Sequence, residues 1–132
     1  MNLLLKRCYA TEDLFLKRDI ENLKIIIEYC NNVENALLCF GSDEEDFIEK
    51  IHFQQTCAFS IEQIGERVKR LSHELIQKHP EIDWRGIAGL RDVIAHNYGK
   101  IEVFELWKTV IKRVPELKTL CWNILSELER RG

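Results

Sequence analysis

The sequence predicts an all-α protein, an up-and-down bundle of four to five helices. Apolar residues recur at steps of three and four along most of the chain, which is the spacing of one helix face. Only two prolines and six glycines interrupt the 132 residues, and no stretch alternates between apolar and polar residues for long enough to form a strand. The length and the 45% hydrophobic content suit one domain with one core.

The first clear helix begins near Ile20 and ends at Gly41, a residue that readily stops a helix. Residues 1–17 carry a weaker pattern. We expect them to form an N-terminal arm or a short helix ahead of a single helical domain over residues 18–132. The apolar stripe of the first clear helix comprises Ile20, Leu23, Ile27, Cys30, Val33, Leu37 and Phe40.

A second, long helix is expected next. Ser42 or Asp43 can cap its first turn, where acidic residues are favoured by the helix dipole. The same apolar face continues as far as Leu75, and the helix should stop near Pro80. The residues of this face are Phe47, Ile51, Ala58, Ile61, Ile64, Val68, Leu71 and Leu75.

A third helix should cover "WRGIAGLRDVIA", with Asp83 as its N-terminal cap. Asn97 and Gly99 both tolerate a positive φ angle, so this helix should end around Ala95 or His96. A fourth helix is expected from about residue 102, and a proline at position 115 fits the first turn of a fifth. The inward residues of these last two helices are Val103, Leu106, Trp107, Val110, Ile111, Val114, Leu117, Leu120, Cys121, Ile124 and Leu128.

Several positions inside these helices depart from the regular pattern. Gln54 and Gln55 interrupt the apolar stripe of the second helix, so a kink or break can occur there. Gly65 lies within the same helix, where glycine costs about 1 kcal/mol relative to alanine. Close approach of a neighbouring helix is the simplest explanation. Gly86 and Gly89 on the third helix also permit a close approach, and packing within the same chain is slightly favoured for them.

Composition excludes several classes of protein. The net charge of −3 disfavours a chain that binds nucleic acid over its whole surface. No apolar run approaches the roughly 18 residues that a membrane span needs. In "MNLLLKRCYA" the basic residues follow the apolar ones, which is the reverse of a secretory signal, so we expect a cytoplasmic protein. The five scattered cysteines include no C-x-x-C pair and indicate neither a disulfide framework nor a zinc knuckle.

Two polar patterns are weaker indications of function. Glu49 and His52 form one E-x-x-H, the local unit of di-iron bundles, but that site needs a second copy and further glutamates. No second copy is present, so we expect no metal and no cofactor. A basic stretch is interleaved with glutamates and indicates a salt-bridged surface more than a track for phosphates. It contains Glu62, Glu66, Arg67, Lys69, Arg70, Glu74 and Lys78.

The most informative stretch is "RDVIAHNYG". Arg91 and His96 are five residues apart, so on a continuous helix their side chains would point about 140° away from each other. If the helix stops at Ala95, the chain can turn His96 back towards Arg91. The alternative is a surface histidine at the C-terminal end of a helix, which is a common and favourable position.

An arginine and a histidine held together suit metal-independent cleavage of RNA. Histidine titrates near neutrality and can accept or donate protons. Arginine offers a fixed fork of donors that matches a phosphate and stabilises the charge that develops on it. One such pair makes a sparse site, and a symmetric dimer would bring two copies of Arg91 and His96 into one cleft.

"RDVIAHNY" resembles the R-x-x-x-x-H-x-Y signature of HEPN-domain proteins, specifically the HepT-like toxins. The resemblance extends to "FSIEQIGERVKRLSHEL" and to the block from "PEIDWRG" through "KRVPEL", and it covers about residues 18–128. Residues 1–17 do not resemble the usual start of the family. The resemblance implies a helical homodimer with a composite ribonuclease cleft formed by the paired motifs.

By position, the resemblance implies that Arg91 and His96 are the catalytic pair. Asp92 would orient one of them, and Asn97 would have a turn or hydrogen-bonding role. Tyr98 matches the tyrosine that a partner nucleotidyltransferase antitoxin modifies with AMP in HepT-like systems. AMP beside the cleft would add bulk and negative charge where the RNA phosphate must enter.

Two other readings remain open on sequence alone. The first is a non-catalytic HEPN module that binds a nucleotidyltransferase partner, RNA or a nucleotide without cleavage, and the acidic net charge mildly favours it. The second is purely structural, with "RDVIAHNYG" as a well-capped helix end. A monomer in solution would favour the structural reading because the composite cleft needs two chains.

Overall fold

The structure is a computed structural model that describes residues 3–97, 99 and 102–131, with side chains from Glu12 onward. Within this part of the chain every regular element is helical, which confirms the predicted all-α class. Four helices are long: α1 (Leu3–Phe40), α3 (Ile51–Val68), α5 (Trp84–Asn97) and α7 (Val114–Arg131). Three short helices and one π-helical turn connect them: α2 (Glu44–Glu49), α4 (His73–Lys78), α6 (Val103–Lys108) and η2 (Thr109–Arg113).

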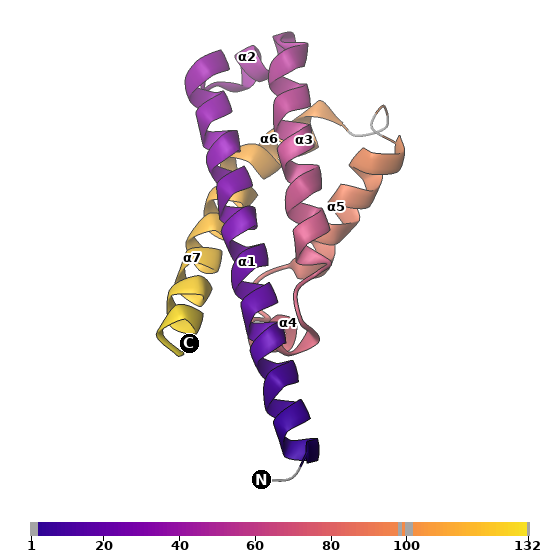
Figure 1. Cartoon of the computed structure of the whole chain (residues 1–132). Helices are drawn as coiled ribbons and strands as arrows, with labels where there is room; N and C mark the ends of the chain where they lie inside the picture. Colours follow the sequence, from indigo (N-terminus) through magenta and orange to yellow (C-terminus); the bar gives the residue numbers. More distant parts are fainter. Residues whose placement is uncertain (1–2, 98, 100–101, 132) are drawn as a thin grey trace.

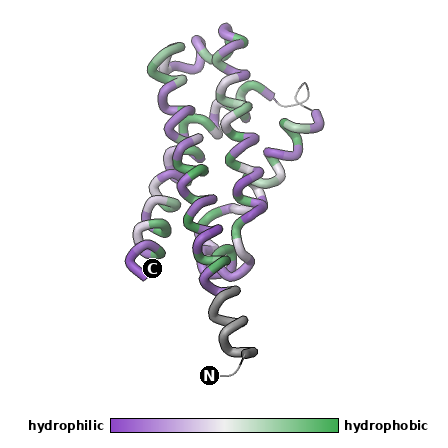
Figure 2. Tube along the Cα trace, viewed as in Figure 1, coloured by the Kyte–Doolittle hydropathy of each residue, from purple (hydrophilic) through white to green (hydrophobic). Residues whose placement is uncertain are grey.

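The long helices run up and down and pack as neighbours in the order α7, α1, α3, α5 (Figure 1). Helix α1 therefore lies between α7 and α3, and α5 rests on α3. Apolar and polar residues alternate along each helix with the helical period (Figure 2), as expected where one face of each is buried. The core includes an aromatic cluster in which the ring of Phe47 lies 4.9 Å from that of Phe53 and 5.1 Å from that of Trp107.

The first helix differs from the prediction at its beginning. Helix α1 has 38 residues and starts at Leu3, so residues 3–17 continue the same helix instead of forming a separate arm. Its predicted end is confirmed, because Gly41 has a φ of 126° and donates its N–H to the carbonyl of Leu37 at 3.3 Å. Only glycine adopts such a φ without strain.

The predicted second helix is wrong as one continuous element, because it is divided into α2, α3 and α4. Asp43 caps α2 by accepting a hydrogen bond from the N–H of Asp46 at 2.8 Å, as predicted. The chain breaks at Lys50, four residues before the first of the two glutamines. Gln54 stabilises the break at this earlier position, because its buried amide donates hydrogen bonds to the carbonyls of Phe47 at 2.8 Å and Ile48 at 3.0 Å. These carbonyls lie in the last turn of α2, where no helical N–H can reach them.

The second division lies between α3 and α4 and is held from a distant part of the chain. Ser72 caps α4 by accepting from the N–H of Leu75. Asp19, buried on α1, in turn accepts hydrogen bonds from the backbone N–H of Ser72 at 2.8 Å and from its hydroxyl at 2.6 Å. A tertiary contact therefore favours the turn over a continued helix.

The last two predicted helices are joined without a loop. Pro115 occupies the first turn of α7, as predicted. Its ring removes a backbone donor and would crowd the carbonyl of the preceding helical turn. The chain widens into the π-turn η2 just before it, where the N–H of Val114 reaches the carbonyl of Thr109. No helix in the part of the chain that the structure describes is long and apolar enough to cross a membrane.

Candidate active site

The motif helix α5 begins as predicted. Asp83 caps it by accepting from the N–H of Gly86 at 3.0 Å, and its other carboxylate oxygen pairs with Arg113 at 2.9 Å. The last residue of α5 is Asn97, which is one or two residues beyond the predicted end around Ala95 or His96. His96 is itself helical, so the prediction that it folds back beside Arg91 is wrong. Nothing in the described residues stops the helix before Asn97.

Arg91 is fixed where α5 crosses α3. Its side-chain stem lies directly on Gly65, and a β-carbon added to Gly65 would overlap the Cβ of Arg91 and come within 2.9 Å of its Cγ. The same β-carbon would lie 3.1 Å from the carbonyl oxygen of Ile87. The predicted reason for Gly65, close approach of a neighbouring helix, is confirmed, and the neighbour carries the motif arginine.

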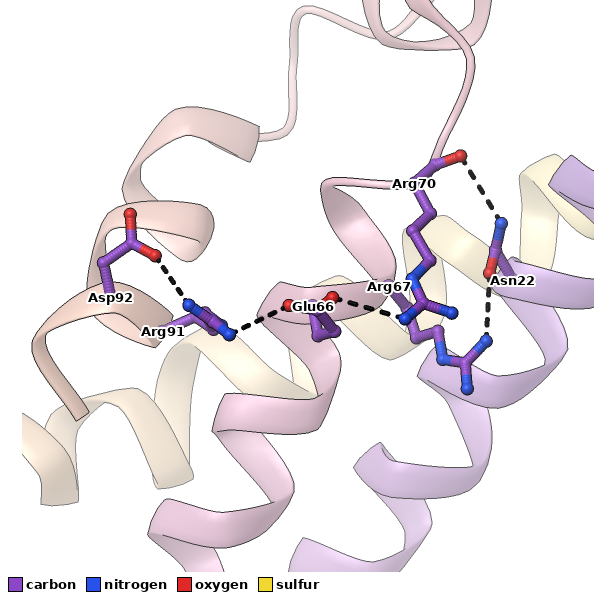
Figure 3. Close-up of polar contacts among 6 residues, drawn as sticks. All are labelled: Asn22, Glu66, Arg67, Arg70, Arg91 and Asp92. Atoms are coloured by element: carbon purple, nitrogen blue, oxygen red, sulfur yellow. Dashed lines mark hydrogen bonds and ion pairs between the residues drawn. The ribbon is translucent and has the colours of Figure 1, made fainter. Parts of the chain in front are cut away.

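The guanidinium of Arg91 lies between two carboxylates (Figure 3). Its Nη2 is 3.1 Å from Oε2 of Glu66 on α3, and its Nη1 is 3.1 Å from Oδ1 of Asp92. Oε1 of Glu66 also pairs with Arg70 at 3.3 Å, and Oδ1 of Asp92 accepts from Lys69. The ammonium of Lys69 and then the Arg91 guanidinium hold the pKa of Asp92 below its ordinary value. The Nε of Arg91 is buried and has no hydrogen-bond partner in the structure.

Asn22 anchors the opposite side of this cluster to α1 (Figure 3). It accepts a hydrogen bond from Arg67 and donates one to the carbonyl of Arg70, both at 3.5 Å. The prediction of a salt-bridged surface along this stretch is confirmed, because Lys69, Arg70 and Lys78 each pair with a carboxylate.

His96 and Asn97 lie in the last turn of α5 with exposed side chains. Five helical positions separate His96 from Arg91, so within one chain the two side chains point about 140° apart and start roughly 7.5 Å apart along the axis. The structure therefore brings Asp92 to Arg91 but does not bring His96 to either. Tyr98 lies outside the described residues.

The two glycines of α5 have different surroundings. A β-carbon on Gly86 would overlap the carboxylate of Asp83 in its own cap and lie 3.1 Å from Nη2 of Arg113, so Gly86 makes room for two side chains of the same chain and not for another helix backbone. Gly89 has nothing within 4 Å of the place where a β-carbon would lie, so the expectation of packing within the same chain is wrong for Gly89. Gly89 and Val93 are exposed on the side of α5 that α3 does not cover.

The E-x-x-H does not lie on one helix face, because α2 ends at Glu49 and α3 begins at Ile51, just before His52. Among the residues with described side chains, no group of three or more His, Cys, Asp or Glu could hold a metal ion. The sequence did not predict that Gly65, Glu66 and Lys69 surround Arg91 and Asp92. The available signal was Ile64-Gly65-Glu66, where a glycine inside a helix is followed by a carboxylate.

Comparison with known families decides the assignment. The "Ribonuclease HepT-like" family matches residues 26–124, three quarters of the chain, including the whole of α3 and α5. The chain belongs to the HepT-like ribonuclease family. The match confirms the resemblance read from "RDVIAHNY".

Individual HepT-like relatives support the same assignment. A protein of Methanocaldococcus jannaschii that is named as an inferred RNase is 35% identical over 115 residues, 87% of this chain and 88% of the relative. A probable ribonuclease HepT of Thermococcus cleftensis is 34% identical over 104 residues, 79% of this chain and 86% of the relative. An inferred RNase of Caldanaerobacter subterraneus subsp. tengcongensis is 36% identical over 87 residues, 66% of this chain and 78% of the relative. No solved structure gives a significant match.

Proposed function

We propose that this chain is a metal-independent endoribonuclease toxin whose cleft is completed by a second copy of the chain. The observation that carries the dimer is the separation of Arg91 and His96 on one unbroken helix. A single chain presents them on diverging faces, whereas two chains related by a two-fold axis can place Arg91 of one copy opposite His96 of the other. Membership of the HepT-like ribonuclease family supports RNA as the substrate.

The chemistry that these groups can carry out is an internal transfer at phosphorus. His96 accepts the proton of the RNA 2′-hydroxyl, and O2′ attacks the adjacent phosphorus. As the P–O2′ bond forms, the P–O5′ bond breaks and a proton is returned to O5′ by a protonated histidine of the paired motifs. The products are a 2′,3′-cyclic phosphate and a 5′-hydroxyl. Arg91 stabilises the negative charge on the non-bridging oxygens in the transition state.

The supporting residues have roles that fit their places. Asp92 holds Arg91 and is itself held by Lys69, so it acts on the arginine and not on the histidine. Asn97 ends α5 and can offer its amide beside His96. Tyr98 follows directly, and we propose it as the site where a nucleotidyltransferase antitoxin attaches AMP. The modification would place a phosphate next to His96 and repel the RNA backbone.

The test is cleavage of single-stranded RNA by unmodified protein in the presence of EDTA. The parent should cleave and leave cyclic phosphate ends, whereas His96→Ala and Arg91→Ala should lose most of the activity. Equal cleavage by His96→Ala, or no cleavage by an unmodified parent, would contradict the proposal.

The second candidate is a non-catalytic module that binds its nucleotidyltransferase partner, RNA or a nucleotide. The engagement of Arg91 by two carboxylates favours it, because both partners compete with a phosphate. Mass spectrometry distinguishes the toxin from the non-catalytic module. The protein is co-expressed with a nucleotidyltransferase encoded by the neighbouring reading frame, and Tyr98 is examined for AMP. AMP on Tyr98 would support the regulated toxin, and an unmodified tyrosine in a stable complex would support the module.

A further inference from the structure

Glu66 occupies a distinctive place beside Arg91. Each of its carboxylate oxygens meets one guanidinium, Oε1 that of Arg70 in the turn that follows α3 and Oε2 that of Arg91 on α5. It directly follows Gly65, the residue that supports the stem of Arg91. The polypeptide thus holds the arginine at two successive positions of α3, first at its β- and γ-carbons and then at its charged end.

These contacts define the orientation of the guanidinium. Each η nitrogen of arginine carries two hydrogens, and the two carboxylates lie one beside each η nitrogen. Nη1 donates a hydrogen bond to Asp92, Nη2 forms an ion pair with Glu66, and the buried Nε faces the protein. The side chain of Arg91 is still 23% exposed, so part of it faces solvent. The planar fork of an arginine matches two oxygens of one phosphate when its orientation is fixed.

We propose that Glu66 is a positioning residue for Arg91 in RNA cleavage, which holds the guanidinium ready for the phosphate. This inference rests on the proposed ribonuclease function. A donor that is already oriented needs no reorganisation as charge develops in the transition state. The pair is partly exposed, with 32% of the Glu66 side chain accessible, so it adds little to folding stability and acts through geometry.

The variant Glu66→Gln tests the proposal by separating kcat from KM. It keeps the shape of the side chain and removes the charge that holds Nη2. We expect kcat to fall about 10- to 100-fold, the loss typical of a misplaced catalytic group. KM for RNA should stay equal or decrease, because one negative charge beside the phosphate is gone. Glu66→Asp, which keeps the charge but retracts it by one methylene, should give an intermediate kcat.

Two control variants isolate the contact with Arg91. Arg70→Ala removes the other partner of Glu66 but leaves the Glu66–Arg91 pair in place, so its kcat should stay well above that of Glu66→Gln. Glu74→Gln breaks a matched i,i+4 pair with Lys78 that lies outside the cluster and should change nothing. Unchanged kcat in Glu66→Gln would overturn the proposal. An increased kcat would overturn it too, since Glu66 would then be a competitor of the phosphate.

A measurement without RNA keeps this inference separate from the proposed function. In protein with 15N-labelled arginine, the Nη resonances of Arg91, assigned by their loss in Arg91→Lys, should be resolved by slow rotation about the Nε–Cζ bond. They should merge in Glu66→Gln. If the parent protein shows resolved resonances but does not cleave RNA, only the proposed ribonuclease function is refuted. If the guanidinium rotates freely in the parent protein, only the positioning role of Glu66 is refuted.

Discussion

The β-carbon of Arg91 occupies the space that any side chain at position 65 would need. Gly65 therefore does more than permit two helices to touch, because it fixes the depth at which the motif arginine sits on α3. Neither of the two groups behind this restriction can easily move out of the way. The stem of Arg91 can shift only with its helix, and the carbonyl of Ile87 belongs to the backbone of α5.

Gly65→Ala should push α5 away from α3. Overpacking of this kind costs about 1–3 kcal/mol, of which the better helix propensity of alanine returns about 1 kcal/mol. We expect a net loss of stability in urea unfolding and a larger loss of RNA cleavage, because Arg91 moves with its helix. Gly89→Ala is the matched control. It adds a β-carbon to open space on α5, the helix of Arg91, and should stabilise the protein by up to about 1 kcal/mol. Stability equal in the two variants would contradict the close approach.

Gln54→Met should weaken the junction between α2 and α3. The substitution keeps the length of the side chain and leaves the carbonyls of Phe47 and Ile48 without their donor, at a cost of about 1–3 kcal/mol. Urea unfolding measures the loss. Gln55→Met, on the exposed neighbour, should stay within about 0.5 kcal/mol of the parent. If both variants are equally stable, Gln54 does not maintain the break.

Mixed dimers of Arg91→Ala and His96→Ala chains should recover cleavage that neither variant has alone. A cleft that takes its arginine from one chain and its histidine from the other has one intact copy in such a mixed dimer. Random mixing should restore about a quarter of the parent activity. Refolding the two variants together and assaying RNA cleavage checks this, with each variant refolded alone as control. No recovery would show either that each chain uses its own pair or that one cleft needs both copies of Arg91 or His96.

Asp92 should contribute stability that disappears in acid. Its folded pKa is lowered from 3.8, mainly by Lys69, so the folded state binds its proton less readily than the unfolded state does. The contribution is therefore fully present above about pH 5 and is lost as the pH falls through the folded pKa. Urea unfolding of the parent and Asp92→Asn between pH 7 and 2 should give curves that converge below pH 3.8. When both proteins also carry Lys69→Met, most of the difference in their unfolding free energy at pH 7 should disappear. A difference that stays the same would contradict Lys69 as the main cause.

Local signals predicted several features of the fold well. Asp43, Asp83, Gly41 and Pro115 act through their own backbone geometry or nearest neighbours, and each does what its position indicated. Gly65 was informative for a similar reason, because a helical glycine is costly unless something needs the space.

Other features depend on contacts that sequence spacing does not reveal. The turn before α4 relies on Asp19, 53 residues away, and the break at Lys50 on a glutamine inside the following helix. The π-turn was hidden because Val110, Val114 and Leu117 keep the α-helical spacing across it. In the candidate site, the motif identified Arg91 and Asp92 but not their partners on α3. Its two ends were expected to meet in one chain, and the helix carries them apart.

If Arg91 is in the ribonuclease cleft as proposed, the charge of its surroundings determines how RNA arrives. Three cationic side chains (Lys69, Arg70, Arg91) and two anionic ones (Glu66, Asp92) leave only one net positive charge, on a chain that is acidic as a whole. Such a surface exerts little attraction beyond the screening length of about 8 Å at physiological salt. We therefore expect an RNA strand to be captured on contact and not attracted from a distance. The rate of capture should depend on how accessible and flexible the RNA backbone is more than on ionic strength.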